Sequence, residues 1–92
     1  MKPGPHRLQI QIDDDVAQGV YVNMATVTHS PTEFLFDFIF VQPQQPRAKV
    51  RSRVITSPQH AKRFLLAMQE NLRRYEERFG PIDLGSETTP VH

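Results

Sequence analysis

The chain has 92 residues, a formal net charge of +1 and no cysteine. This length fits one domain, the charge excludes a strong overall attraction to nucleic acid or membranes, and the composition excludes stabilisation by disulfides. A chain this short buries a thin core, so we expect it to gain stability by oligomerisation. No apolar run approaches the ~20 residues that span a bilayer, and the first residues lack the apolar core of a signal peptide. We therefore expect a cytoplasmic protein without a membrane partner.

The first half of the chain predicts a disordered tail and two strands. Residues 1–6 contain two prolines and a glycine, which is typical of a disordered tail. Residues 7–12 alternate polar and apolar side chains, which predicts a half-buried strand, and residues 13–19 predict a turn. Residues 20–29 predict a second strand. Its two faces are expected to carry Val20, Val22 and Met24 on one side and Tyr21, Asn23, Ala25 and Val27 on the other.

Two further strands are predicted at residues 34–41 and 48–56. The first is apolar on both faces, which indicates a central strand. One of its faces carries Phe34, Phe36, Phe38 and Phe40, and the other carries Leu35, Asp37, Ile39 and Val41. In the last strand, strict alternation puts Val50, Ser52 and Val54 on one face and Lys49, Arg51, Arg53 and Ile55 on the other.

A long amphipathic helix is predicted from Ser57 to Phe79. Ser57 is a good N-cap, Pro58 suits the first helical position, and Gly80 suits the C-terminal end. Apolar residues at alternating spacings of four and three form one seam along the helix. The seam is Ala61, Leu65, Met68, Leu72, Tyr75 and Phe79. Residues 83–92 show no periodicity and are expected to be a flexible tail, which leaves residues 7–82 as one domain.

These elements predict an α+β fold: a four-stranded antiparallel meander followed by one long C-terminal helix, in the order ββββα. The helix is expected to cover the phenylalanine face of the sheet. The opposite face is expected to hold Tyr21, Ala25, Val27, Leu35, Ile39, Val41 and Ile55, and no second helix covers it. Because this face is too apolar for water, the sequence predicts a homo-oligomer, a dimer or a higher assembly.

Asp37 is the most informative polar residue, because it lies in the middle of an apolar strand face. A buried carboxylate needs a partner, and Arg51, Arg53 or Asn23 could supply one across the sheet. We expect an ion pair that fixes strand register at a chain–chain interface, with a functional role as the alternative. The predicted interface or binding residues are Tyr21, Asn23, His29, Asp37, Ile39, Arg51 and Arg53.

Two alternative functions remain open. The basic segment Arg47–Arg53 could bind nucleic acid, although the two tyrosines do not flank it in sequence. His29, Ser30, Glu33 and Asp37 could form a hydrolase site, although Ser30-Pro31 is more typical of a turn. The four histidines lack the spacing of metal ligands. We predict no catalytic, cofactor-binding or metal-binding residue.

Several short motifs resemble one bacterial family. They are Gly19–Asn23, Thr28–Phe34 with Asp37-Phe38, Val50–Val54, Ser57–Arg63, Asn71, Tyr75-Glu76 and Phe79-Gly80. They resemble the uncharacterised domain-of-unknown-function family 3467 over roughly residues 7–82. The resemblance implies a compact, standalone cytosolic protein and no defined activity.

The predicted order of elements is also similar to the SecB-type export chaperone. That family assembles dimers into tetramers and holds unfolded clients in apolar grooves. No SecB sequence motif is present, so this similarity concerns the fold alone. Together these observations predict a non-enzymatic, oligomeric binding or adaptor module. Holdase-like binding of a protein client is one form of that function.

Overall fold

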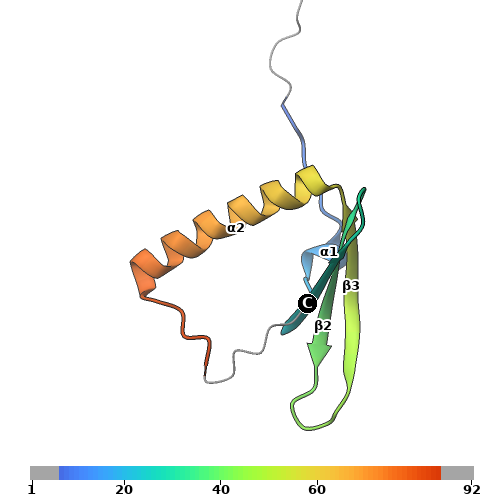
Figure 1. The fold of residues 1–92 in the computed structure, drawn as a ribbon, viewed down its shortest axis with the longest axis vertical. Helices are drawn as coiled ribbons and strands as arrows, with labels where there is room; N and C mark the ends of the chain where they lie inside the picture. The colour runs from blue at the N-terminus through green and yellow to red at the C-terminus, as the bar shows by residue number, and fades with distance from the viewer. Residues whose placement is uncertain (1–6, 86–92) are drawn as a thin grey trace, which may run out of the picture.

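The computed structural model of the protein describes residues 7–85. These residues form one antiparallel sheet, in the order β1-β2-β3, with a short helix before it and a long helix after it (Figure 1). The elements are α1 (Asp14–Ala17), β1 (Met24–His29), β2 (Phe34–Val41), β3 (Ala48–Thr56) and α2 (Pro58–Phe79). The α+β class, the meander and the long C-terminal helix are confirmed. The predicted number of strands, four, is wrong.

The missing strand is the one predicted at residues 7–12, which form no regular structure. Leu8 and Ile10 alternate with polar residues as a strand would, yet they are 84% and 85% exposed. An alternating segment is a strand only when it pairs with a neighbouring strand. Within residues 7–85 the outer edges of β1 and β3 are unpaired, but residues 7–12 lead away from the sheet (Figure 1). Part of the predicted turn at residues 13–19 is the single-turn helix α1. The tail predicted at 1–6 and most of that at 83–92 lie outside the described residues.

The β2–β3 pairing contains an irregularity that changes which side chains share a face. Asp37 pairs with Arg53 and Phe38 with Ser52, but Ile39 pairs with Val50. Arg51 is therefore the extra residue of a β-bulge. Beyond the bulge the alternation inverts, so Val50 lies on the Asp37 face and Lys49, opposite Phe40, lies on the phenylalanine face. The strict alternation predicted for residues 48–56 is wrong at these positions.

The β1–β2 pairing also corrects one predicted face. Val27 pairs with Phe36 and Ala25 with Phe38, so both belong to the phenylalanine face rather than to the face of Asp37. Residues 20–23 precede β1 instead of extending it. At this end the Asn23 side chain donates to the Val41 carbonyl oxygen (3.0 Å) and accepts from the Val41 N–H (2.8 Å). A side chain thus replaces the next backbone pair of the ladder.

Helix α2 begins and ends as predicted. The Ser57 hydroxyl accepts a hydrogen bond from the His60 N–H (3.1 Å), and Gly80, with φ of +95°, follows the last helical residue. The helix lies on the phenylalanine side of the sheet, as predicted, where the Phe64 and Phe36 rings pack edge to face at a centroid distance of 5.8 Å, but it covers only part of this face. Only the first turns of α2 contact the sheet, and the helix then runs away from it (Figure 1).

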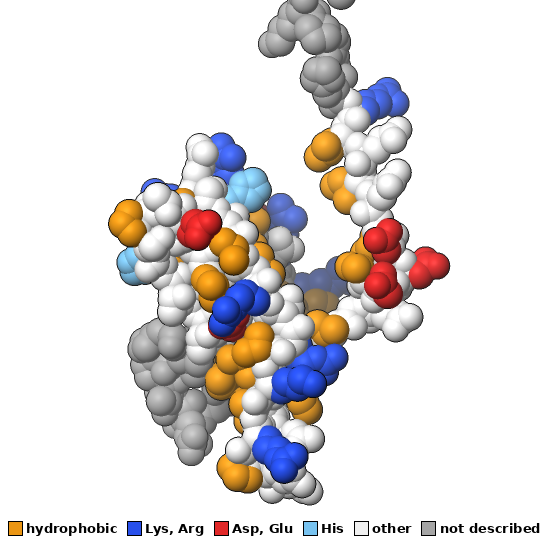
Figure 2. Space-filling view, turned by 90° about the vertical axis from the view of Figure 1, so that its right-hand side faces the viewer, with side chains coloured by type: hydrophobic (Ala, Val, Ile, Leu, Met, Phe, Trp, Pro, Cys, Tyr) orange, Lys and Arg blue, Asp and Glu red, His pale blue; other side chains and the backbone are white. Residues whose placement is uncertain are grey.

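The core of this arrangement is very small. Within residues 7–85, Ile39 and Ala61 are the buried apolar residues, and each is still 7% exposed. Large apolar side chains of α2 and of the segment before β1 remain open. Figure 2 shows hydrophobic side chains exposed between charged ones on the opposite side of the molecule from most of α2. A single chain therefore leaves much of its apolar surface uncovered.

Candidate functional site

The largest apolar feature is a groove between the phenylalanine face and α2, which we call the helix groove. Ala25, Val27 and Phe36 line it from the sheet, and Ala61, Phe64 and Leu65 line it from the helix. Its volume is about 670 Å³. The walls are apolar because the apolar faces of the sheet and of α2 meet here. A groove remains between them because the helix lies at an angle to the sheet instead of packing flat against it (Figure 1). Such a groove suits an apolar partner surface rather than a polar ligand.

The seam of α2 continues the groove beyond the sheet. Leu65, Met68 and Tyr75 are 53%, 45% and 50% exposed, and Phe79 at the far end is 66% exposed. Tyr75 and Phe79 contact each other at a centroid distance of 5.0 Å, and both line a shallow apolar surface with Ile82. The predicted seam is thus present as a continuous stripe, about half of which remains open to water.

The opposite side of the sheet carries the predicted ion pair. The Arg53 guanidinium donates to both carboxylate oxygens of Asp37, from Nε at 2.7 Å and from Nη2 at 2.9 Å. Asp37 is 9% exposed, whereas the Arg53 side chain is 59% exposed. The hydrogen bond from Arg53 lowers the pKa of Asp37, against the effect of burial, which raises it. Because the two residues face each other across β2 and β3, the pair fixes the register of these strands.

The other predicted site residues do not gather around this pair. Arg51 is the bulge residue, Ile39 is buried, and Asn23 extends the β1–β2 ladder. Tyr21 contacts the edge of Phe40 at a centroid distance of 6.2 Å. The His29 ring stacks on Phe34 at 5.4 Å. The structure therefore places these residues in separate environments rather than in one site.

His29 and Ser30 lie at the turn between β1 and β2. The Ser30 hydroxyl oxygen accepts hydrogen bonds from the backbone N–H groups of Thr32 (3.3 Å) and Glu33 (3.2 Å). The Ser30 N–H donates to the Glu33 carbonyl oxygen (2.9 Å), which closes the turn. The hydroxyl thus has the partners of a turn residue, and the His29 ring packs on an aromatic neighbour.

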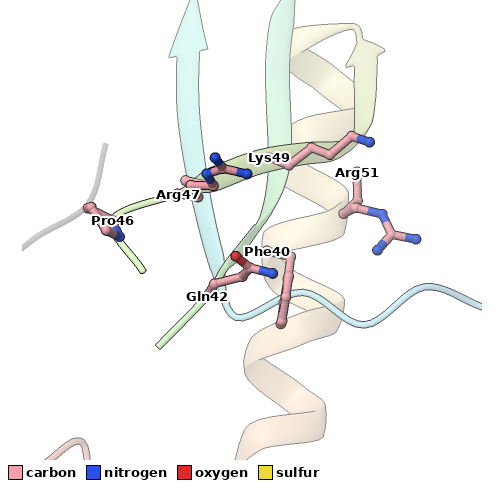
Figure 3. A pocket seen from close by; sticks show the side chains of 7 residues that line it. Phe40, Gln42, Pro46, Arg47, Lys49 and Arg51 are labelled. Carbon is pink, nitrogen blue, oxygen red and sulfur yellow. The ribbon is translucent and has the colours of Figure 1, made fainter. Parts of the chain in front are cut away.

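A second surface lies at the end of the β2–β3 hairpin, where the sequence predicted the basic segment Arg47–Arg53 but not the side chains of β2 that lie beside it. Phe40 and Gln42 face the same open concavity, of about 720 Å³, as Arg47, Lys49 and Arg51 (Figure 3). We call this the hairpin surface. The bulge at Arg51 brings Lys49 to the side of Phe40, and bulges are only weakly encoded in residue patterns. The signal that the sequence did offer was the basic segment Arg47–Arg53 itself.

Residues 7–85 contain neither a cluster of potential metal ligands nor a membrane-spanning helix. No group of three or more His, Cys, Asp or Glu side chains in this range could hold a metal ion. In the same part of the chain, neither helix has the length and apolar character needed to cross a bilayer.

Comparisons with known proteins identify a family but no function. No curated protein and no solved structure matches the chain. The predicted similarity to SecB-type chaperones is not confirmed, since the sheet has three strands and no solved structure supports it. Residues 1–84 match the family described as protein of unknown function DUF3467, as its motifs had indicated. The match covers nearly all of the 92 residues, so the chain belongs to the DUF3467 family.

Proposed function

We propose that this protein is a non-enzymatic binding module that works as a homo-oligomer, with a dimer formed through the helix groove as its basic unit. The observation on which the proposal rests is the exposed apolar groove between the phenylalanine face and α2. The seam residues along it, from Leu65 to Phe79, are about half exposed in a single chain. Burial of such a surface is the main favourable term in protein association.

The chain as a whole, including the exposed segment before β1, has more surface than a compact monomer, which is consistent with a dimer. The chain exposes 8945 Å², whereas a compact monomer of 10.6 kDa exposes about 5,500 Å². The thirteen residues outside the described range can account for at most about 2,000 Å² of this excess, at the exposure of an unfolded chain. The remaining ~1,400 Å² exceeds the ~800 Å² that each partner contributes to a standard interface.

A second copy is the occupant that best fits the helix groove. An apolar face of a helix or a sheet would fill the groove. The exposed seam of α2 in a second copy of the chain is such a face. In a two-fold dimer the contact is reciprocal, so the seam of each chain can fill the groove of the other. One contact then buries the helix groove and much of the seam of both chains, and it leaves apolar side chains elsewhere, such as Leu8 and Ile10, exposed.

A binding rather than catalytic role is supported by the partners of the candidate catalytic groups. Ser30 serves a turn and the Asp37 carboxylate is paired with Arg53. In a dimer, the apolar surfaces that remain open would bind a protein partner, in an adaptor role or as a holdase for an unfolded client. This is the function class that we infer for the protein.

Sedimentation velocity at protein concentrations from 1 to 100 µM tests the assembly. We expect a species of twice the chain mass that dissociates on dilution. A folded monomer throughout this range would refute the proposal. The binding role is tested separately, by light scattering of reduced, aggregating lysozyme with and without equimolar protein. We expect slower aggregation, and unchanged scattering would count against the holdase form.

A further inference from the structure

The positive charges of the chain are concentrated in one part of the sequence, although the net charge is small. Residues 38–69 contain six Lys or Arg residues and no Asp or Glu. This stretch includes the end of β2, all of β3 and the first half of α2. At the end that carries the β2–β3 loop, the face drawn in Figure 2 shows basic and apolar side chains and no acidic one. The protein thus has a local positive field despite its charge of +1.

The cations of the hairpin surface differ from those near the end of α2. Arg73 and Arg74 are bound to Glu70, and Arg73 also to Glu77, as expected for a solvated helix face. Within residues 7–85, no carboxylate lies within 4.0 Å of the cationic groups of Arg47, Lys49 and Arg51. These three cations are therefore available to an anion from outside the chain.

One aromatic ring lines the same concavity as these cations, and a second ring adjoins the first. Phe40 lines the same concavity as Arg47, Lys49 and Arg51 (Figure 3), and Tyr21, which is 73% exposed, meets the edge of Phe40. A basic groove with an adjoining aromatic surface is how proteins bind single-stranded nucleic acid, because cations track the phosphates and bases stack on the rings.

We propose that the hairpin surface binds single-stranded nucleic acid without strong sequence preference. Arg47, Lys49 and Arg51 bind backbone phosphates, and Tyr21 and Phe40 stack on bases. An anionic membrane fits the surface less well. The loop at residues 42–46 consists of glutamine and proline, so it lacks the large apolar side chain that would enter a bilayer. This site lies apart from the helix groove and does not depend on the proposed dimer.

Fluorescence anisotropy with labelled 15-nucleotide oligo(dT) and oligo(U), from 25 to 300 mM KCl, tests the proposal. We expect micromolar binding at low salt, with a log–log salt slope of about −2 for three phosphates of a single strand. The triple variant Arg47→Gln/Lys49→Gln/Arg51→Gln should bind at least tenfold more weakly. The control Arg7→Gln/Arg63→Gln/Arg78→Gln removes the same charge elsewhere and should lose less than threefold. Equal losses in the two variants, or no binding by the unaltered protein, would overturn the site.

The aromatic part of the proposal has its own test. Tyr21→Leu alters an exposed side chain, so the fold should survive, and we expect about tenfold weaker binding of oligo(dT) with unchanged binding of heparin. Phe40→Leu should act in the same direction, with circular dichroism verifying the fold. Unchanged oligo(dT) binding by both aromatic variants would reduce the surface to a general anion site and overturn the proposal. Tighter binding to vesicles with 30% phosphatidylserine than to oligo(dT) at equal salt would overturn it too.

Discussion

Leu65 and Leu66 form a natural matched pair for testing the helix groove. They are consecutive residues of α2, of the same type and nearly the same exposure, 53% and 55%. Leu65 lines the helix groove and Leu66 does not, because consecutive residues project about 100° apart around a helix. Changing each to alanine has the same effect on helix propensity. Any difference between the two variants therefore reports the surface that each side chain contacts.

The expected size of the difference follows from exposure. Burying a whole leucine side chain contributes about 1.5–3 kcal/mol, and about half of Leu65 is still open in one chain. Losing this burial through Leu65→Ala should cost ~1 kcal/mol per chain, and a two-fold interface contains the change twice. The total of ~2 kcal/mol corresponds to a dimer dissociation constant raised about 30-fold.

Sedimentation equilibrium over a dilution series measures both variants against the unaltered protein. We expect the Leu65→Ala curve to shift to higher concentration by about 30-fold and the Leu66→Ala curve to shift by less than threefold. Denaturation by urea should confirm that both variants fold. Equal shifts, or a larger shift for Leu66→Ala, would refute the assignment of the dimer interface to the helix groove.

Three further predictions concern elements that hold the fold. Ser57→Ala should lower the free energy of unfolding by ~1 kcal/mol through loss of the helix cap, measured by urea denaturation, with Ser57→Asp near the unaltered value. Gly80→Ala should cost roughly 1–3 kcal/mol in the same assay, because φ of +95° strains any residue with a side chain although the space around it is open. Arg53 lowers the pKa of Asp37 in the folded protein below its value of about 3.8 in the unfolded chain. The ion pair therefore stabilises the fold fully above pH 3.8, and this stabilisation is lost as the pH falls through the lowered pKa. Asp37→Asn should accordingly lower the free energy of unfolding at pH 7 and lower it much less at pH 3. The control Asp83→Asn should change the free energy of unfolding little at either pH. An equal loss of stability at both pH values in Asp37→Asn would contradict the ion-pair account.

The elements predicted best are those with local signals at both ends. Helix α2 has a serine cap, a proline at its first position and a glycine at its end, and each acts through nearby backbone groups. The strands at residues 34–41 and 48–56 are bounded by proline-containing turns, and their extents are confirmed. Asp37 was recognised because a carboxylate in an apolar strand needs a partner, and the structure supplies Arg53.

The errors concern features that depend on distant residues. Residues 7–12 have the pattern of a strand, but whether they pair with another strand depends on residues distant in sequence, which their own pattern does not specify. The faces of Ala25 and Val27 depend on the register with β2, which periodicity leaves open. The bulge at Arg51 adds one residue to β3 without any glycine to mark it. Each error comes from a long-range pairing rather than from local preference.

The bulge also explains how one strand face serves two proposed purposes. Phe34, Phe36 and Phe38 line the helix groove, whereas Phe40 continues the same stripe beyond the reach of α2. Strict alternation along β3 would have placed Val50 beside Phe40 and extended the apolar surface to the end of the hairpin. The extra residue at Arg51 inverts the alternation and places Lys49 there instead. A stripe that is uniformly aromatic in sequence thus divides into an apolar part suited to a second chain and a basic part suited to a polyanion.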